Sequence, residues 1–256
     1  MEFIDTHSHF YLPDFDKDRE EVMQTCLNAG VKKLLLPNID DCSIEPMLRV
    51  CEQFPKQCYP MLGLHPSDVK EDVEDKLNFI FNHFKENTFI AVGEIGIDLY
   101  WDKTFIKEQQ FAFRKQIDFA LSHDLPLVIH SRKSFAEILA VLNEYSQYAL
   151  KGVFHCFSGD INQAKKAIEK NFYLGIGGVV TYKNAGIQDI VKEISLSHIV
   201  LETDSPFLSP MPYRGKRNQS SYIPLIAEKI AELKEVSVEE VAAITTANAK
   251  RLFNIN

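Results

Sequence analysis

Paired cysteines, long apolar runs and linker-like segments are missing from this chain of 256 residues. Its five cysteines are an odd number and form no C-x-x-C pair, which argues against a disulfide framework and against a thiolate zinc site. No apolar run approaches the roughly 20 residues that cross a bilayer, and the chain does not open with the basic segment of a signal peptide. We therefore expect reduced cysteines, no membrane partner and a cytoplasmic location.

Positive charge is also scarce, since the formal net charge is −8. This balance works against broad electrostatic binding to duplex nucleic acid, which relies on many phosphate contacts from lysine and arginine. If nucleic acid is a substrate, the contact should be local to one site. The composition has no break that would mark a linker, so we expect a single domain over residues 1–256, acting as a monomer.

Short apolar runs alternate with segments of helical period along the whole chain. The expected strands are residues 2–6, 31–36, 59–64, 89–92, 127–129, 153–154, 172–176 and 199–201. They are short and mostly apolar, as is typical of parallel strands covered on both faces. Between them, stripes such as Leu77, Ile80, Phe81 and Phe84 indicate amphipathic helices.

This repeated order predicts an α/β protein with a (β/α)8 TIM barrel, whose active site lies at the carboxyl ends of the strands. A doubly wound open sheet is the alternative fold. It is disfavoured because no glycine-rich phosphate loop follows the first strand, where that fold usually places one.

Side chains that can hold a metal follow several of the expected strands. His7 and His9 end the first strand at positions i and i+2, so their rings share a face. The other candidates stand at four later strand ends: Glu94, His130, His155 and Asp204. Taken singly, each could be a hydrogen-bonded strand-end residue or a helix cap. Together they favour a metal site, because the strand ends of a barrel converge on one mouth, and imidazole with carboxylate suits zinc, manganese or magnesium.

Eight segments give the chain a resemblance to the TatD-type metal-dependent deoxyribonucleases of the amidohydrolase superfamily. They are Asp5-Thr6-His7-Ser8-His9, Gly63-Leu64-His65-Pro66, Gly93-Glu94-Ile95-Gly96-Ile97-Asp98, His130-Ser131-Arg132, His155-Cys156-Phe157-Ser158-Gly159, Glu202-Thr203-Asp204-Ser205-Pro206, Pro212-Tyr213-Arg214-Gly215-Lys216-Arg217-Asn218 and Asn248-Ala249-Lys250-Arg251-Leu252-Phe253. The resemblance spans nearly the whole chain. It implies phosphodiester hydrolysis, commonly from the 3′ end of single-stranded DNA, with a role in repairing damaged ends.

The resemblance also implies two divalent metal ions, which could be Mg²⁺, Mn²⁺ or Zn²⁺. One ion would be held by His7, His9, Glu94 and Asp204, and the second by Glu94, His130 and His155, with Glu94 as the bridging ligand. A metal pair lowers the pKa of bound water from about 15.7 toward 7 and neutralises the oxyanions of an in-line displacement. Asp204 is either the general base for this water or a ligand only.

The candidate substrate contacts are His65, Arg132, Arg214 and Arg217. Arginine can bind phosphate oxygens through two donors. The alternative interpretation of Arg214 and Arg217 is that they lie in a solvated, turn-rich loop and serve only solubility. Tyr100 and Trp101 could stack a nucleobase or pack their loop against the barrel.

Two other functions stay open on the sequence alone. The same ligands would polarise the carbonyl of a small cyclic amide, so an amidohydrolase is the alternative enzyme. The third hypothesis is a non-enzymatic binding module with structural metal. It is disfavoured because structural zinc sites are usually closed and four-coordinate.

Overall fold

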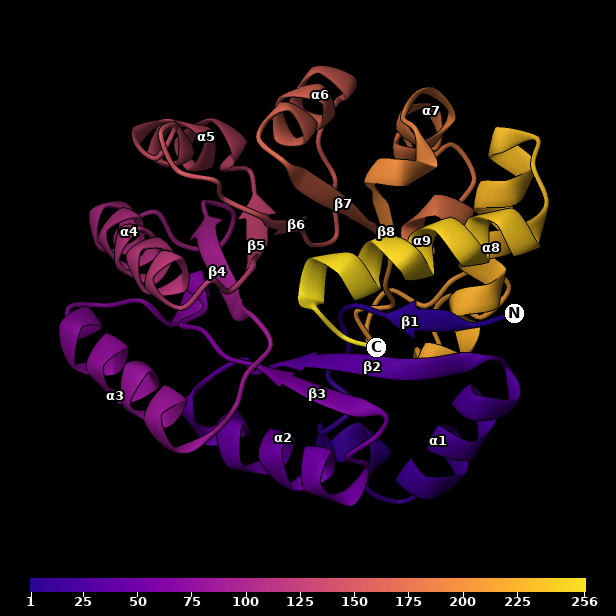
Figure 1. Cartoon of the computed structure of the whole chain (residues 1–256), viewed down its shortest axis with the longest axis horizontal. Coiled ribbons are helices and arrows are strands. Elements are labelled where there is room, and N and C mark those ends of the chain that lie inside the picture. The colour runs from indigo at the N-terminus through magenta and orange to yellow at the C-terminus, as the bar shows by residue number, and fades with distance from the viewer.

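Eight parallel strands alternate with helices in the computed structural model, which describes residues 1–256 (Figure 1). The strands are β1 (Phe3–Asp5), β2 (Val31–Pro37), β3 (Cys58–Met61), β4 (Val92–Asp98), β5 (Leu127–Arg132), β6 (Gly152–Phe154), β7 (Phe172–Ile176) and β8 (Ile199–Leu201). The helices are α1 (Arg19–Asn28), α2 (Asp41–Gln53), α3 (Val73–Glu86), α4 (Ile106–Ser122), α5 (Phe135–Glu144), α6 (Ile161–Glu169), α7 (Ile187–Glu193), α8 (Ile223–Lys234) and α9 (Val238–Phe253). No helix combines the length and the apolar character that crossing a membrane requires.

The strands close into a barrel through two seams. Regular pairing joins β1 to β3 in one group and β4 to β8 in a second group. At one seam the Gly93 amide donates to the Leu62 carbonyl at 3.0 Å, and at the other the Thr6 amide donates to the Leu201 carbonyl at 3.0 Å. The expected (β/α)8 barrel is therefore confirmed.

Strand β4 lies later in the chain than the sequence predicts, because it runs from Val92 to Asp98 and contains Glu94 rather than ending before it. The two glycines beyond the apolar run lie inside the strand and are required there. A Cβ on Gly93 would lie 2.4 Å from the Val128 side chain, and one on Gly96 would lie 2.2 Å from the His130 carbonyl oxygen. Only glycine allows β4 and β5 to approach so closely.

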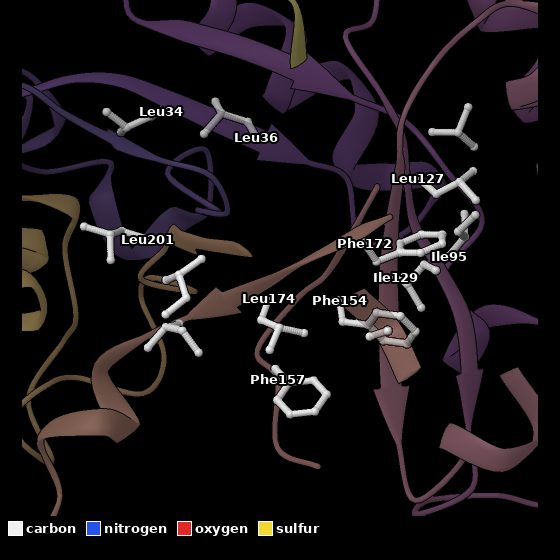
Figure 2. Packing of buried hydrophobic residues seen from close by; sticks show 14 of the residues in the cluster. Leu34, Leu36, Ile95, Leu127, Ile129, Phe154, Phe157, Phe172, Leu174 and Leu201 are labelled. Carbon is white, nitrogen blue, oxygen red and sulfur yellow. The ribbon is translucent and has the colours of Figure 1, made fainter. Parts of the chain in front are cut away.

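The core has two layers, because neighbouring residues of a strand point to opposite faces. Leu34 and Leu36 of β2 pack in the large cluster between strands and helices, and Figure 2 shows them with other members such as Phe154. Leu35, between them, belongs to a smaller cluster with Val128 and residues from most of the other strands. This smaller cluster fills the barrel interior.

Helix α9 closes the amino-terminal end of the barrel. It crosses in front of the strands in Figure 1, and Leu252 and Phe253 at its end pack into the interior cluster. The Thr246 hydroxyl donates to the Glu2 carbonyl at 2.8 Å, and the Asn248 amide donates to the Leu196 and Ile199 carbonyls. The opposite end, where the strands finish, is left for a site.

Candidate metal centre

The six side chains that the sequence assigns to metal converge at the carboxyl end of the barrel. Five strand ends supply them: His7 and His9 follow β1, Glu94 lies in β4, His130 in β5, His155 follows β6 and Asp204 follows β8. Most of these side chains are buried, and Glu94 is only 4% exposed. Burying so many ionisable groups together is costly unless they are paired or bind metal.

Asp5 fixes the two strand ends that carry His7 and Asp204. One of its carboxyl oxygens accepts from the His7 amide at 3.2 Å and from the Thr203 amide at 2.9 Å. Its other oxygen accepts from the Thr203 hydroxyl at 2.5 Å. Burial raises the pKa of Asp5 to about 7, although these hydrogen bonds act to lower it. Burying this carboxyl group costs free energy, which is consistent with a role in positioning the two strand ends.

Glu94 lies between two groups of histidines. Its Oε2 lies 3.3 Å from His7 Nε2. Its Oε1 lies 2.8 Å from His130 Nδ1 and 3.7 Å from His155 Nε2. Burial alone would raise the pKa of Glu94, but the surrounding histidines hold it well below its usual range. The carboxylate is thus ionised and has one oxygen available to each group.

One donor pair of the first group has the spacing of a metal site, and a second pair is wider. His9 Nε2 lies 3.3 Å from Asp204 Oδ1, and His7 Nε2 lies 3.9 Å from the same oxygen. Donors about 2.1 Å from one ion lie roughly 3.0 to 3.4 Å apart at octahedral or tetrahedral angles. Burial would raise the pKa of Asp204, but hydrogen bonding to His9 and the nearby histidines lower it overall, which keeps the carboxylate ionised.

An unsatisfied histidine supports the fit to a metal. His7 is fully buried; its Nδ1 has no hydrogen-bonding partner, and its Nε2 has only the contact of 3.3 Å with Glu94 Oε2, which is not oriented as a hydrogen bond. A buried polar atom without a partner costs about 1 to 3 kcal/mol. A cation beside Glu94 would satisfy the Nε2 of His7. By the spacing of their donor atoms alone, three clusters around Glu94 and Asp204 could hold a metal ion: His7, His9 and Glu94; His7, His155 and Asp204; and His65, Glu94 and His130.

Tyr11 sets the proton position of His9. The Tyr11 hydroxyl donates its only proton to the Pro37 carbonyl at 2.7 Å, so it must accept from His9 Nδ1 at 3.0 Å. Burial raises the pKa of Tyr11 well above its usual range, which keeps that proton in place. Nδ1 of a neutral His9 therefore carries the ring proton, and Nε2 keeps its lone pair for a metal.

Two further carboxyl groups stand behind the second group of histidines. Asp98 Oδ2 lies 2.9 Å from His130 Nε2, and Glu202 Oε1 lies 3.1 Å from His155 Nδ1. Burial would lower both histidine pKa values, but the surrounding carboxylates raise that of His130 to about 9 and that of His155 to about 10. Both rings are protonated at neutral pH without metal, so each must release a proton to become a ligand.

His65 lies beside the same carboxylate, with its Nε2 3.5 Å from Glu94 Oε1. The Ser67 amide donates to His65 Nδ1 at 3.1 Å, so a neutral His65 carries its proton on Nε2. An N–H that faces the centre can donate to a substrate oxygen but cannot bind a metal. Its predicted place among the substrate contacts agrees with this tautomer.

The three arginines predicted to contact substrate have different surroundings. The Arg132 guanidinium lies 4.1 Å from the centre of the Tyr100 ring, and Arg214 lies 4.7 Å from the centre of the Tyr182 ring. Arg217 instead donates to both oxygens of Asp18, at 2.8 and 2.6 Å, and to the Asp14 carbonyl at 2.6 Å. Three of the five N–H donors of Arg217 are thus engaged and its charge is paired with Asp18, whereas Arg132 and Arg214 have no carboxylate partner.

Sequence reasoning did not find Tyr11 or assign a role to Asp98. The signal for Tyr11 is its place two residues after His9, which continues the alternation that begins at His7. Asp98 lies four residues after Glu94 in the same strand and also shares its face. Its role depends on the neighbouring strand β5, which supplies His130.

The barrel and its buried clusters of histidine and carboxylate define the class of protein, a metal-dependent hydrolase. A family model described as TatD related DNase matches residues 4–254, so the chain belongs to that family.

Individual relatives agree with this assignment. The chain is 40% identical over 254 residues to an uncharacterized metal-dependent hydrolase, YabD of Bacillus subtilis, and the match covers 99% of each chain. It is 28% identical over 247 residues to the 3′-5′ ssDNA/RNA exonuclease TatD of Salmonella typhimurium, covering 94% of this chain and 95% of the relative. Among solved structures, the TatD homologue YjjV of Escherichia coli superimposes with a TM-score of 0.92 at 30% identity, covering 99% of this chain and 98% of that chain.

Proposed function

We propose that this protein hydrolyses phosphodiester bonds in DNA and removes nucleotides from the 3′ end of single strands. The observation that carries the proposal is the position of Glu94, whose two oxygens face separate groups of histidines. A carboxylate shared in this way suits a two-metal site, which in nucleases and phosphatases clamps both the attacking and the leaving oxygen. The exonuclease from Salmonella typhimurium, as a relative over nearly the whole chain, supports the same activity.

We assign the side chains to two ions as follows. His7, His9, Glu94 and Asp204 hold one ion, and Glu94, His130 and His155 hold the other. When bound, two divalent ions such as Mg²⁺, Mn²⁺ or Zn²⁺ polarise the phosphoryl group and supply a water of lowered pKa.

Asp204 is our candidate for the group that accepts the proton of the attacking water. Its side chain is 17% exposed whereas that of Glu94 is 5% exposed, so Asp204 is the carboxylate that substrate and water can reach. His65 donates from Nε2 to a phosphate oxygen. We place this activity in the processing of damaged DNA ends in the cytoplasm.

The direct test is hydrolysis of an end-labelled single strand. Protein treated with a chelator should be inactive, and adding back Mg²⁺, Mn²⁺ or Zn²⁺ should restore shortening from the 3′ end. If none of the three metals supports shortening, the proposal fails.

Metal counting tests the assignment of ligands separately from activity. The double variant His7→Ala with His9→Ala should lose one bound ion per chain by mass spectrometry and keep the second at least in part. Loss of neither ion would contradict the assignment.

The alternative of a small cyclic amide as substrate fits the surroundings of the centre less well. Arg132 and Lys133 are exposed beside it, and a neutral amide has no use for cations. Replacing Arg132 by Ala should raise KM for DNA. An unchanged KM would favour the amide.

A further inference from the structure

We infer that a cavity beside the metal centre binds an unpaired nucleotide next to the scissile phosphate, with its base stacked on Tyr100, whose ring lies edge-on to that of Trp101 at 4.8 Å between ring centres. This inference rests on the proposed function and specifies the substrate. The cavity has a volume of about 610 Å³ and lies between the segments that follow β5 and β6. Its lining includes Tyr100, Arg132, Lys133, Phe135 and His155. Because His155 is also a candidate ligand, the cavity borders the centre.

The aromatic rings are exposed to solvent, although Arg132 and Lys133 lie over that of Tyr100, so a base stacks there beside these cations or displaces them. Trp101 is 72% exposed and Tyr100 is 47% exposed, so neither ring serves mainly to pack its loop against the barrel. Exposed aromatic faces are costly in water, and an aromatic face stacks well on any nucleobase. Phe135, from the first turn of α5, adds an apolar wall.

The charges of the cavity suit a phosphate. Arg132 and Lys133 lie over the Tyr100 ring, at 4.1 and 5.0 Å from its centre, and neither forms an ion pair with a carboxylate. Glu137 is the only carboxylate in the lining. Arg217 illustrates the contrast, because its guanidinium is already paired with Asp18. In a chain with a net charge of −8, two unpaired cations next to exposed aromatic rings favour an anionic, aromatic ligand.

One carboxylate fixes the aromatic pair relative to the metal centre. Asp98 Oδ1 accepts from the Tyr100 amide at 2.8 Å and from the Trp101 amide at 3.3 Å. Its Oδ2 lies 2.9 Å from His130 Nε2. The loop that carries the rings and a candidate ligand are therefore held by the same side chain, so a base on the rings has a defined distance to the phosphate at the centre.

Stacking on these rings requires a base whose face is accessible. A blunt duplex buries that face against the neighbouring base pair, whereas a single strand or an overhang exposes it. The cavity therefore selects unpaired ends. Removing a stacking ring should weaken binding by roughly 5- to 150-fold.

Trp101 allows a direct measurement, because it is the only tryptophan in the chain. We would titrate the full-length protein with a phosphorothioate-linked oligothymidylate of four nucleotides, which resists hydrolysis, and follow tryptophan fluorescence. Saturable quenching is expected with the oligonucleotide and not with tripolyphosphate, an anion without bases. No quenching, or equal quenching by tripolyphosphate, would overturn the inference.

Variants locate the binding site. Tyr100→Ala keeps Trp101 as the reporter and should raise the Kd by roughly 5- to 150-fold, whereas Tyr100→Phe should restore binding. Tyr148→Ala is the matched control, because Tyr148 is 52% exposed and precedes β6 at the opposite end of the barrel. Equal weakening by Tyr100→Ala and Tyr148→Ala would refute a stack at this site.

Hydrolysis of methyl p-nitrophenyl phosphate, a diester without a nucleobase, separates this inference from the proposed function. Tyr100→Ala should lower kcat/KM for a single strand by a larger factor than it lowers kcat/KM for this diester, and equal losses would refute a contact with the base. If the protein hydrolyses no diester yet the oligonucleotide still quenches Trp101, the proposed function fails and the nucleotide site stands. If diesters are hydrolysed without quenching, the reverse holds.

Discussion

Replacing Tyr11 by Phe should weaken metal binding at the centre without disturbing the barrel. The substitution keeps the buried ring and removes only the hydroxyl that accepts from His9 Nδ1 and donates to the Pro37 carbonyl. Loss of an outer partner of a metal-binding histidine typically costs 10- to 100-fold in affinity, or about 1.4 to 2.7 kcal/mol. The two polar groups left without a partner should also lower the unfolding free energy of the metal-free protein by about 1 to 3 kcal/mol.

Competition with a chromophoric chelator measures this affinity, and denaturant unfolding in the presence of a chelator measures the stability. Tyr145→Phe is the matched control, because its hydroxyl lies 3.2 Å from the Arg114 carbonyl and 2.9 Å from Asp118 Oδ1, on the outer helices. It should leave metal affinity unchanged. The reasoning about the His9 tautomer is wrong if Tyr11→Phe and Tyr145→Phe bind metal with equal affinity.

Three further changes have defined outcomes. Glu94→Gln should leave at most one ion per chain and reduce hydrolysis by more than about 100-fold with an unchanged circular dichroism spectrum; two retained ions would exclude a bridging role. In the metal-free protein, the pKa of His130 is raised from 6.5 to about 9, so its contribution to stability is present below pH 6.5 and is lost as the pH rises through 9. Metal affinity should rise over the same interval, because the ring must lose a proton to bind metal. Denaturant unfolding measures the first trend and calorimetry of metal binding the second. Gly175→Ala would place a Cβ 2.2 Å from Glu202 Oε2 and should weaken metal binding, because Glu202 contacts the candidate ligand His155. The control Gly186→Ala, whose Cβ would have no atom within 4 Å, should not. Equal metal affinities of the two variants would mean that Glu202 does not orient a ligand.

The strand order and the types of side chain at the strand ends follow from the sequence because both depend on local patterns. Short apolar runs separated by amphipathic segments predict eight strands, and His7 and His9 share a face through their spacing alone. The placement of β4 does not follow, because the apolar run ends at Val92 and the strand continues only through its close approach to β5, which Gly93 and Gly96 allow.

The sequence by itself determined the barrel and the chemistry at its mouth, histidines and carboxylates able to hold metal ions. Only the tertiary structure decided which oxygen of Glu94 faces which histidine, which nitrogen of His9 carries the proton, and that Arg217 is engaged by Asp18 while Arg132 is not. These are contacts between strands and loops far apart in the chain. Their distances are set by barrel closure, which no local pattern of residues encodes.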